Sequence, residues 1–436
     1  MSALKKAVLV GGDVLILYVS LAITLIIRYG LSPLNQQLDA HLLPFSLVFL
    51  VWLLVFYLAD LYRFRALSTY FLLFKSLALA ILISGGVSIV IFYLFGSFFE
   101  LTPKTNLLIF TGVFLALDYL WRVGALKISA SGAEQAIIMG DSSLISETIE
   151  YLEKNKQGGY KVAAHFKDLK TENFQEIANL IKEKNIRLLI IQPHLTKDFS
   201  TLHLVYELLP LGVSIINFWD FYEVIFEKVP LEELEETWFI ENITTRRPFY
   251  DSVKRILDIV LGAIAAILFL PMAILIALFI KITSRGPVIY KQDRVGLNGG
   301  VFTLHKFRTM KHKSDGPLWT EKNDQRLTAF GKILRVSHLD EIPQLINILR
   351  GDISFTGPRP ERIELAKEFS KFPHYEMRHA VKPGLTGWAQ ISFKPSASLE
   401  EAYEKLRYDI YYVKNRSLFL DLLIILKTIK YLFTSK

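Results

Sequence analysis

The sequence predicts a membrane protein of mixed α and α/β structure: a four-helix transmembrane bundle, a small doubly wound α/β domain, and an α/β domain that enters the membrane through a re-entrant helix. Three observations predict this class. Hydrophobic residues make up 52% of the 436 residues, more than soluble proteins usually carry. Several apolar stretches approach the length of a membrane span. Short strand-like and helix-like segments alternate before the last of these stretches.

Four apolar stretches fill the first domain, which we place at residues 1–127. They cover residues 7–27, 42–61, 71–95 and 107–121, each close to the roughly 20 residues that cross a bilayer core. Loops on one side carry most of the cations, namely Lys5, Lys6, Arg63, Arg65, Lys75, Arg122 and Lys127. The positive-inside rule therefore places both ends of the bundle in the cytoplasm.

Three acidic residues, Asp13, Asp60 and Asp118, lie within or at the edges of these spans. An isolated charge inside a bilayer is unfavourable, so such residues usually face the bundle interior and pair. We expect these acids to pair within the bundle rather than to perform chemistry.

Residues 134–235 show the alternation of a doubly wound α/β domain. The segments AIIMG, KVAAHF, RLLIIQP and VSIINF are typical of strands, and ENFQEIANLIKEKN and LHLVYELLPLG are typical of helices. The turn GDSSLIS offers only Gly140, whereas a dinucleotide-binding turn has three glycines. We therefore predict a degenerate Rossmann-like domain with a structural or regulatory role, followed by a linker at 236–250.

The last domain, 251–436, begins with an apolar segment that we expect to form a re-entrant helix at 254–282. Lys254 and Arg255 precede this segment, and Lys281 and Arg285 follow it. Cations on both flanks favour two ends on the same membrane face. Pro271 lies near the middle and supplies the break, because it lacks an N–H group. A kinked fifth span remains the alternative.

The formal net charge of the whole chain is +8. The positive charge is concentrated in the last third of the chain. Such a region should meet phosphates, an anionic membrane surface or both. Nucleic acid is not expected as a partner, because no nucleic-acid-binding motif accompanies the charge. The apolar C-terminal segment SLFLDLLIILKTIKYLF is typical of an interfacial helix or of a core helix. The chain has no cysteine, which excludes a thiol nucleophile and a cysteine-based zinc site.

The segment KQDRVGLNGGVFTLHKFRTM is rich in turns and cations, Arg294 among them, and ends in a probable strand. Alternation along that strand would place Lys306 and Arg308 on one face, where they could grip a diphosphate. The glycines at 296, 299 and 300 would let backbone amides approach an anion. A plain hairpin with solvated charges is an equal alternative.

The segment SHLDEIPQLINILRGDISFTGPRPE carries an adjacent acid pair, Asp340 and Glu341. Ser337 can cap a helix and Pro343 fits its first turn, which would place the pair at a helix N-terminus where the dipole favours ionised carboxylates. An ionised carboxylate there can attack phosphorus or hold Mg²⁺. Surface acids that merely complement the helix dipole are the alternative, but Arg350, Asp352 and a conformationally fixed Arg359 follow closely.

Four motifs, KFRTM, LDEIPQLINILRGDISFTGPRPE, KPGLTGWAQ and YDIYYVKNRSLFLDLLIILKT, together resemble the bacterial sugar transferases, the polyprenyl-phosphate hexose-1-phosphate transferases. The resemblance covers residues 250–436 almost continuously. The four spans and the degenerate α/β domain ahead of it are similar to the long membrane form of that family, which starts exopolysaccharide, capsule or O-antigen assembly.

The resemblance implies a bacterial inner-membrane enzyme whose catalytic domain faces the cytoplasm. It would move a sugar 1-phosphate from a UDP-sugar to undecaprenyl phosphate and release UMP. Asp340 would form a phospho-aspartyl intermediate, and Glu341, with Asp340 beside it, would bind Mg²⁺. The substrate-binding residues implied by motif position are Arg294, Lys306, Arg308, Arg350, Pro358, Arg359 and Pro360.

Two departures from the family pattern concern the sugar rather than the reaction. Residues 391–394 read Ile-Ser-Phe-Lys where many relatives have Asn-Gly-Arg, and Arg416 stands where a tryptophan is common. Two other functions stay open, a catalytically silent membrane scaffold that binds lipid and nucleotide, and a transferase whose site lies among the spans. The sequence leaves open the sugar, the polysaccharide pathway, any ligand of the α/β domain and the oligomeric state, for which a homodimer is a guess.

Overall fold

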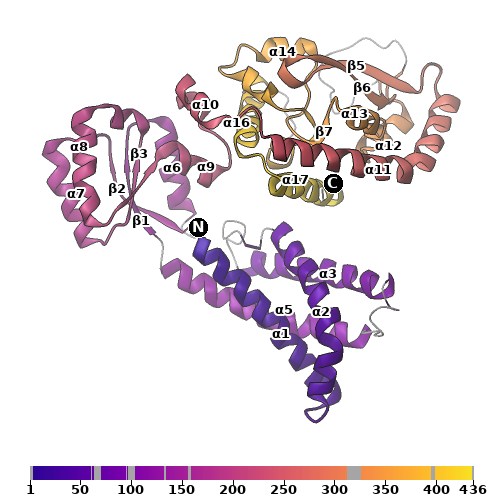
Figure 1. Ribbon diagram of the computed structural model, residues 1–436, viewed down its shortest axis with the longest axis horizontal. Helices are drawn as coiled ribbons and strands as arrows, with labels where there is room; N and C mark the ends of the chain where they lie inside the picture. The colour runs from indigo at the N-terminus through magenta and orange to yellow at the C-terminus, as the bar shows by residue number, and fades with distance from the viewer. Residues whose placement is uncertain are drawn as a thin grey trace. The chain divides into compact units, whose positions relative to one another are not determined.

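The computed structural model describes residues 3–59, 61–62, 70–94, 96, 104–131, 134–155, 159–311, 326–393 and 398–434. Arg63, Arg65 and Asp60 lie outside the described residues, and so do the side chains of Lys5, Lys6, Lys75 and Lys127. The chain forms two compact units, Met1–Phe221 and Tyr222–Lys436, and each is described by itself. Figure 1 shows the elements that each unit contains.

Four long helices open the first unit: α1 (Ala3–Tyr29), α2 (Leu34–Leu58), α3 (Tyr70–Leu94) and α5 (Lys104–Ser131). Each contains a stretch long and apolar enough to cross a membrane, which makes the chain a multi-pass membrane protein. The four helices share one apolar core around Trp52, Phe110 and Phe114, whose rings meet edge to face or stacked. Trp52 also donates a hydrogen bond from Nε1 to Ser88 Oγ at 2.9 Å, which ties α2 to α3.

The expected pairing of acids inside these helices is confirmed for Asp13 and Asp118. Arg122 lies between them, with Nε 2.7 Å from Asp118 Oδ2 and Nη2 bonded to Asp13 Oδ2. All three side chains are at most 2% exposed, and Arg122 also donates to the carbonyl of Leu61. This set, which we name the bundle cluster, links α1 to α5 by charge inside an apolar core.

The rest of the first unit is a parallel α/β domain. Its strands are β1 (Glu134–Met139), β2 (Tyr160–Phe166), β3 (Leu188–Ile191) and β4 (Ser214–Asn217), in the order β2-β1-β3-β4, all parallel. Helices α6 (Ser143–Lys154), α7 (Thr171–Glu183) and α8 (Phe199–Leu208) alternate with the strands, as Figure 1 shows. The chain moves outward from β1 in both directions, which is the doubly wound topology that the sequence predicts.

The Gln192 side chain occupies the turn after β1, where a dinucleotide-binding domain would hold a pyrophosphate. Gly140 has a φ of +139°, and Gln192 Oε1 accepts a hydrogen bond from the Asp141 amide at 3.1 Å. A Cβ atom at Gly140 would lie 2.4 Å from that same oxygen. The amide that would meet a pyrophosphate in a dinucleotide-binding turn is therefore occupied by a side chain.

The second unit begins inside α9 (Phe218–Phe226), before the linker that the sequence predicts. Residues 222–242, with α10 (Glu236–Asn242) at their end, pack on α16 (Leu399–Asn415). Lys228 pairs with Glu404 at 2.6 Å, and Glu223 pairs with Lys414 at 2.8 Å. Ion pairs thus attach residues 222–242 to the last domain.

The core of the second unit is small sheets surrounded by helices. The strands are β5 (Ile289–Val295) antiparallel to β6 (Val301–Phe307), and β7 (Ser354–Thr356) parallel to β8 (Gly384–Thr386). The α-helices are α11 (Pro248–Thr283), α12 (Ala329–Val336), α13 (Gln344–Arg350), α14 (Ile363–Phe369), α15 (Trp388–Ser392), α16 and α17 (Leu418–Thr434). Short 3-10 turns join them: η6 (Leu297–Gly299), η7 (Leu339–Glu341) and η8 (Tyr375–Ala380).

The apolar helix α11 extends on both sides of Pro271, which lies inside it, so a bend of the helix at this proline stays a prediction. Both halves of α11 pack on the same domain. Ala265 and Ala266 lie against the cluster around Leu304, and Ile276 and Ile280 lie against Phe307. Most other apolar side chains of α11 are exposed, which is the pattern of a helix that faces lipid on its outer side.

Candidate active site

The acid pair lies in η7, between α12 and α13. Ser337 does not cap a helix that follows it, because its hydroxyl donates back to the carbonyls of Ile333 and Leu334 and so ends α12. His338 then adopts a left-handed conformation with a φ of 55°, which turns the chain before the pair. Pro343, rather than Ser337, stands at the N-cap of α13. Asp340 and Glu341 therefore lie in a tight turn just ahead of a short helix.

Glu341 lies between two cations. Lys306 Nζ is 2.7 Å from Glu341 Oε1, and Arg359 Nη2 is 3.3 Å from the same oxygen. Burial would raise the pKa of Glu341, but the charges of Lys306 and Arg359 hold that pKa at about 2. Glu341 is consequently an ionised carboxylate at any physiological pH.

Asp340 is more deeply buried, with 8% of its surface exposed. Burial raises the pKa of Asp340, Lys306 opposes this shift, and the neighbouring charge of Glu341 adds to it. Burial also lowers the pKa of Lys306, although Glu341 opposes that effect. The two acids thus differ, since two cations hold Glu341, whereas Asp340 is buried without an ion-pair partner among the described residues.

Arg308 does not point to Glu341 as Lys306 does. It follows β6, is 6% exposed, and donates from Nη2 to the carbonyl of Ser284 at 2.8 Å. Its Nε and Nη1 atoms have no hydrogen-bond partner within the described part of the chain. A buried guanidinium with two unused donors calls for an acceptor, and a phosphate oxygen is a suitable one.

The Pro-Arg-Pro segment is held by its backbone. The Pro358 carbonyl accepts from the Gly384 amide at 2.9 Å, and the Pro360 carbonyl accepts from Arg294 Nη1 at 3.0 Å. Burial and the charge of Arg359 lower the pKa of Arg294 to about 10. Arg294 therefore positions the segment that carries Arg359, whereas the two prolines fix its path.

One expectation for anion contacts fails in the structure, and the role of Arg350 in substrate binding stays a prediction. The turn amides of the glycines at 296, 299 and 300 donate to carbonyls within the same turn, so they are not free to approach an anion. The physical reason is that the turn closes on itself through a left-handed Asn298. Arg350 is exposed at the end of α13 and is not among the partners of the acid pair.

A buried ion pair, Arg378 with Asp409, holds the backbone of Arg359, and sequence reasoning missed it. Arg378 donates from Nη2 to the Arg359 carbonyl at 2.9 Å and pairs with Asp409 Oδ2 at 2.7 Å. Asp409 falls within the YDIYY motif, so the motif contained a signal, but nothing in the sequence linked it to Arg378. These two residues position Arg359 without touching the acid pair.

The two carboxylates of the acid pair could supply some of the oxygen ligands that Mg²⁺ needs. Among the described residues, no group of three or more acidic, histidine or cysteine side chains could hold a metal ion. Mg²⁺ commonly uses only one or two carboxylates and completes its shell with water and substrate phosphates. Asp340 and Glu341 fit this habit, with Glu341 also held by Lys306.

The same part of the chain matches a family model. Residues 249–435 match the model described as "Bacterial sugar transferase". A UDP-glucose:undecaprenyl-phosphate glucose-1-phosphate transferase of Caulobacter vibrioides is 40% identical over 190 residues, which are 42% of this chain and 71% of the relative. The chain belongs to the bacterial sugar transferase family.

Two other family members show how far the likeness extends. A UDP-N-acetylgalactosamine-undecaprenyl-phosphate N-acetylgalactosaminephosphotransferase of Aeromonas hydrophila is 38% identical over 49% of this chain, and the match covers 50% of that relative. A UDP-glucose:undecaprenyl-phosphate glucose-1-phosphate transferase of Escherichia coli is 28% identical over 91% of this chain and 89% of its own length. The relatives' names thus differ in the sugar and agree on the lipid acceptor.

Proposed function

We propose that this chain transfers a sugar 1-phosphate from a UDP-sugar to undecaprenyl phosphate through a phospho-Asp340 intermediate. The observation that carries the proposal is the buried Asp340 beside Glu341, whose carboxylate two cations hold in place. A desolvated carboxylate is a stronger nucleophile than a hydrated one, and the cations around it suit a diphosphate. The names of the relatives support both substrates.

The proposed reaction has two displacements at one phosphorus atom. In the first, an Asp340 oxygen bonds to the β-phosphorus of the UDP-sugar, the bond from that phosphorus to the bridging oxygen breaks, and UMP leaves. In the second, a phosphate oxygen of undecaprenyl phosphate bonds to the same phosphorus, and the bond to Asp340 breaks. The products are undecaprenyl-diphosphate-sugar and the free carboxylate. Neither step needs an oxidant or a reductant.

The surrounding residues have separate roles. Arg308 can donate from its unused Nε and Nη1 atoms to the diphosphate. Arg359, in the Pro-Arg-Pro segment, contacts Glu341 and can donate to the same diphosphate. Lys306 holds Glu341 and lowers the pKa of Asp340, which favours the nucleophilic form. Asp340 and Glu341 would hold Mg²⁺, which supplies charge neutralisation at the phosphate oxygens when bound.

The contacts of α11 support a re-entrant path. A straight helix of 36 residues would be about 54 Å long, well beyond the roughly 30 Å of a hydrocarbon core. Near its start, Arg255 donates to the carbonyls of Ile348 and Leu349, each at 2.7 Å. At its end, the Ser284 carbonyl accepts from Arg308. Both ends are bound to one domain, so we propose that both face the cytoplasm, at the bacterial inner membrane.

This path can be tested with single cysteines, because the natural chain has none. We expect cysteines introduced at Phe249 and Arg285 to react with an impermeant reagent only in inside-out vesicles. Labelling of either position from the opposite side would show a full crossing.

The reaction is tested by release of UMP from a panel of UDP-sugars, with purified protein, undecaprenyl phosphate and Mg²⁺. A donor labelled at its β-phosphate should also label the protein when the acceptor is left out, and adding the acceptor should remove the label. The Asp340→Asn variant should neither release UMP nor become labelled. Asp293→Asn, which changes an exposed acid, is the control and should do both.

The outcomes separate the remaining functions. Absence of UMP with every sugar, from protein that elutes as a folded species, would favour the silent scaffold. Full activity in the Asp340→Asn variant would move the site elsewhere. The sugar that gives UMP would name the donor, and with it the candidate exopolysaccharide, capsule or O-antigen pathway.

A further inference from the structure

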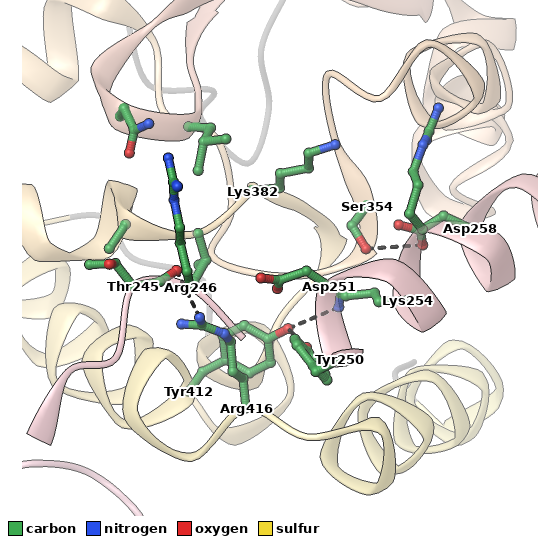
Figure 2. A pocket seen from close by; sticks show the side chains of 15 residues that line it. Thr245, Arg246, Tyr250, Asp251, Lys254, Asp258, Ser354, Lys382, Tyr412 and Arg416 are labelled. Atoms are coloured by element: carbon green, nitrogen blue, oxygen red, sulfur yellow. Dashed lines mark hydrogen bonds between the residues drawn. The ribbon is translucent and has the colours of Figure 1, made fainter. Parts of the chain in front are cut away.

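A cavity bordered by several charged side chains lies in the same unit, and its lining residues include neither the acid pair nor its cations. Its volume is about 540 Å³. The first turns of α11, the η6 turn, the chain after η8 and the end of α16 form its walls. Figure 2 shows Arg246, Lys382 and Arg416 among the side chains that surround it.

The cavity is rich in positive charge. Five cationic side chains line it, namely Arg246, Lys254, Arg255, Lys382 and Arg416, against two carboxylates. Both carboxylates already accept hydrogen bonds. Asp258 Oδ1 accepts from Ser354 Oγ at 3.0 Å, as Figure 2 shows, and Asp251 Oδ2 accepts from the Arg247 amide at 2.9 Å.

One of the five cations is paired with a carboxylate, and a second has its donors used by backbone carbonyls. Lys254 pairs with Asp421 at 2.7 Å, and Arg255 is bound to the backbone carbonyls at the end of α13. Arg246 and Lys382 make no ion pair with any residue in the described ranges. The cavity therefore holds more positive charge than its own walls neutralise.

Arg416 is the most confined of these cations. It is 2% exposed, and Nη2 donates to the carbonyls of Thr244 and Thr245 at 2.8 and 3.0 Å. Nη1 donates to the Val413 carbonyl, and Nε has no hydrogen-bond partner among the described residues. The Tyr250 ring also lies 5.9 Å from the Arg416 guanidinium, but no carboxylate among the described residues forms an ion pair with it. A buried guanidinium without an ion-pair partner suits a nearby anion.

The charge also affects neighbouring groups. Burial and the charge of Arg255 lower the pKa of Lys382, and burial and the charge of Arg247 lower that of Arg416. Both shifts follow from burial and from neighbouring positive charge, and a bound anion would oppose that charge.

The position of the cavity indicates the source of the anion. It borders the start of α11, where Phe249 is 80% exposed and Ile256 is 60% exposed. The apolar length of α11 begins there, which places the cavity at the depth of lipid headgroups if that length is in the bilayer. Cations at this depth attract anionic lipids.

We propose that this cavity binds the phosphate of an anionic phospholipid headgroup, through Arg246, Lys382 and Arg416. The bound phosphate would neutralise the cavity and fasten the start of α11 to the membrane surface. The residues that line this site do not include the acid pair, so the proposal does not depend on the transfer reaction. Phosphate from a soluble source has the same chemistry, and the test distinguishes the two.

The test measures retained lipid by native mass spectrometry. Full-length protein is taken from nanodiscs of phosphatidylcholine with a minor fraction of phosphatidylglycerol. Arg416→Gln would also lose the carbonyl contacts that hold Thr244 and Thr245, so the decisive variant is the double change Arg246→Gln with Lys382→Gln. Its affinity for phosphatidylglycerol should fall on the order of 30-fold, since each surface cation contributes about a fivefold factor. Lys371→Gln, an exposed cation away from the cavity, is the matched control.

Each outcome decides the proposal. Retention in wild type, in the control and in Asp340→Asn, with loss in the double variant, would support it. Equal retention in wild type and the double variant would overturn it. Inorganic phosphate is added separately to detergent-solubilised protein in a thermal shift assay. Protection by phosphate that equals that of the lipid, and that the double variant loses, would assign the cavity to a soluble phosphate and overturn the lipid source.

Discussion

Two clusters of charged side chains, one in each unit, differ in access and in net charge. The bundle cluster has two carboxylates around Arg122, all at most 2% exposed. The acid-pair cluster, which we define as Lys306, Asp340, Glu341 and Arg359, leaves 39% of the Arg359 side chain exposed. Unused donors of Arg308 also lie close along the chain to Lys306.

Access to solvent distinguishes a structural cluster of charges from a reactive one. A cluster that is closed on all sides can only join helices, because no substrate reaches it. A cluster with exposed cations and unused donors is built for a ligand that brings its own negative charge. The first should therefore govern stability and the second should govern turnover.

Neutralising one carboxylate in each cluster should give the largest difference between them. Asp340→Asn should lower UMP release on the order of 10⁴-fold, because the nucleophile is lost while the fold is kept. Asp118→Asn should leave the turnover of the folded fraction unchanged. Both variants are compared at equal amounts of monodisperse protein. A comparable loss of turnover in Asp118→Asn would place chemistry among the spans.

The reverse experiment removes the cation of the bundle cluster. Arg122→Met leaves two carboxylates without a counter-charge in an apolar core, and should reduce stability by about 3–5 kcal/mol. The fraction that remains monodisperse after heating measures this loss. Arg28→Met is the control, because Arg28 is exposed and makes one hydrogen bond, to Asn106. Equal losses of stability in Arg122→Met and Arg28→Met would mean that burial of the ion pairs does not increase their contribution to stability.

Glu341→Gln sharpens the role of the second acid. The amide keeps the size of the side chain but removes the charge that Lys306 and Arg359 share. We expect the affinity for Mg²⁺ to fall roughly 10²-fold, with activity partly recovered at high Mg²⁺. A titration of UMP release against Mg²⁺ measures this shift, and Glu376→Gln, which changes an exposed acid, should not move it. A titration curve that matched wild type would remove Glu341 from the metal site.

The smallest expected effect is a shift in pH dependence. The raised pKa of Asp340 means that the nucleophilic form is gained as pH rises above the ordinary aspartate range, near 3.9, so labelling of the protein by the donor should rise through that raised value. Glu341, with a pKa of about 2, should not contribute a limb in this range. Lys306→Met should move the limb to higher pH, because Lys306 lowers the pKa of Asp340. A limb that moved to lower pH would contradict this electrostatic account.

The sequence could predict the parts of the site that are local in the chain. Asp340 and Glu341 are adjacent, and their motif is continuous with the segment that carries Arg359. Alternation along a strand also suggested that Lys306 faces an anionic group, although the group it meets here is Glu341. Apolar length similarly predicted the long helices, since length and composition are properties of single segments.

The remaining features depend on single backbone angles or on distant partners. His338 turns left-handed, so Ser337 ends one helix instead of starting another, and no periodicity reveals such a residue. The glycine turn closes on itself and uses the amides that the sequence offered to an anion. Arg378 and Asp409 are 31 residues apart and meet only in the folded domain. Long-range contacts of this kind leave no mark in a single sequence.

The ion pair between Lys254 and Asp421 has a consequence for the order of folding in the cell. Its partners are 167 residues apart, and Asp421 also accepts hydrogen bonds from Tyr412 and Thr356. At 5–20 residues per second, the ribosome needs roughly 10 to 30 s to make the chain between them. During that interval α11 is already available to the membrane while Lys254 lacks its ion-pair partner Asp421. The domain can therefore close only when its last helix has been synthesised, and truncation before α17 should leave a chain that quality-control proteases remove.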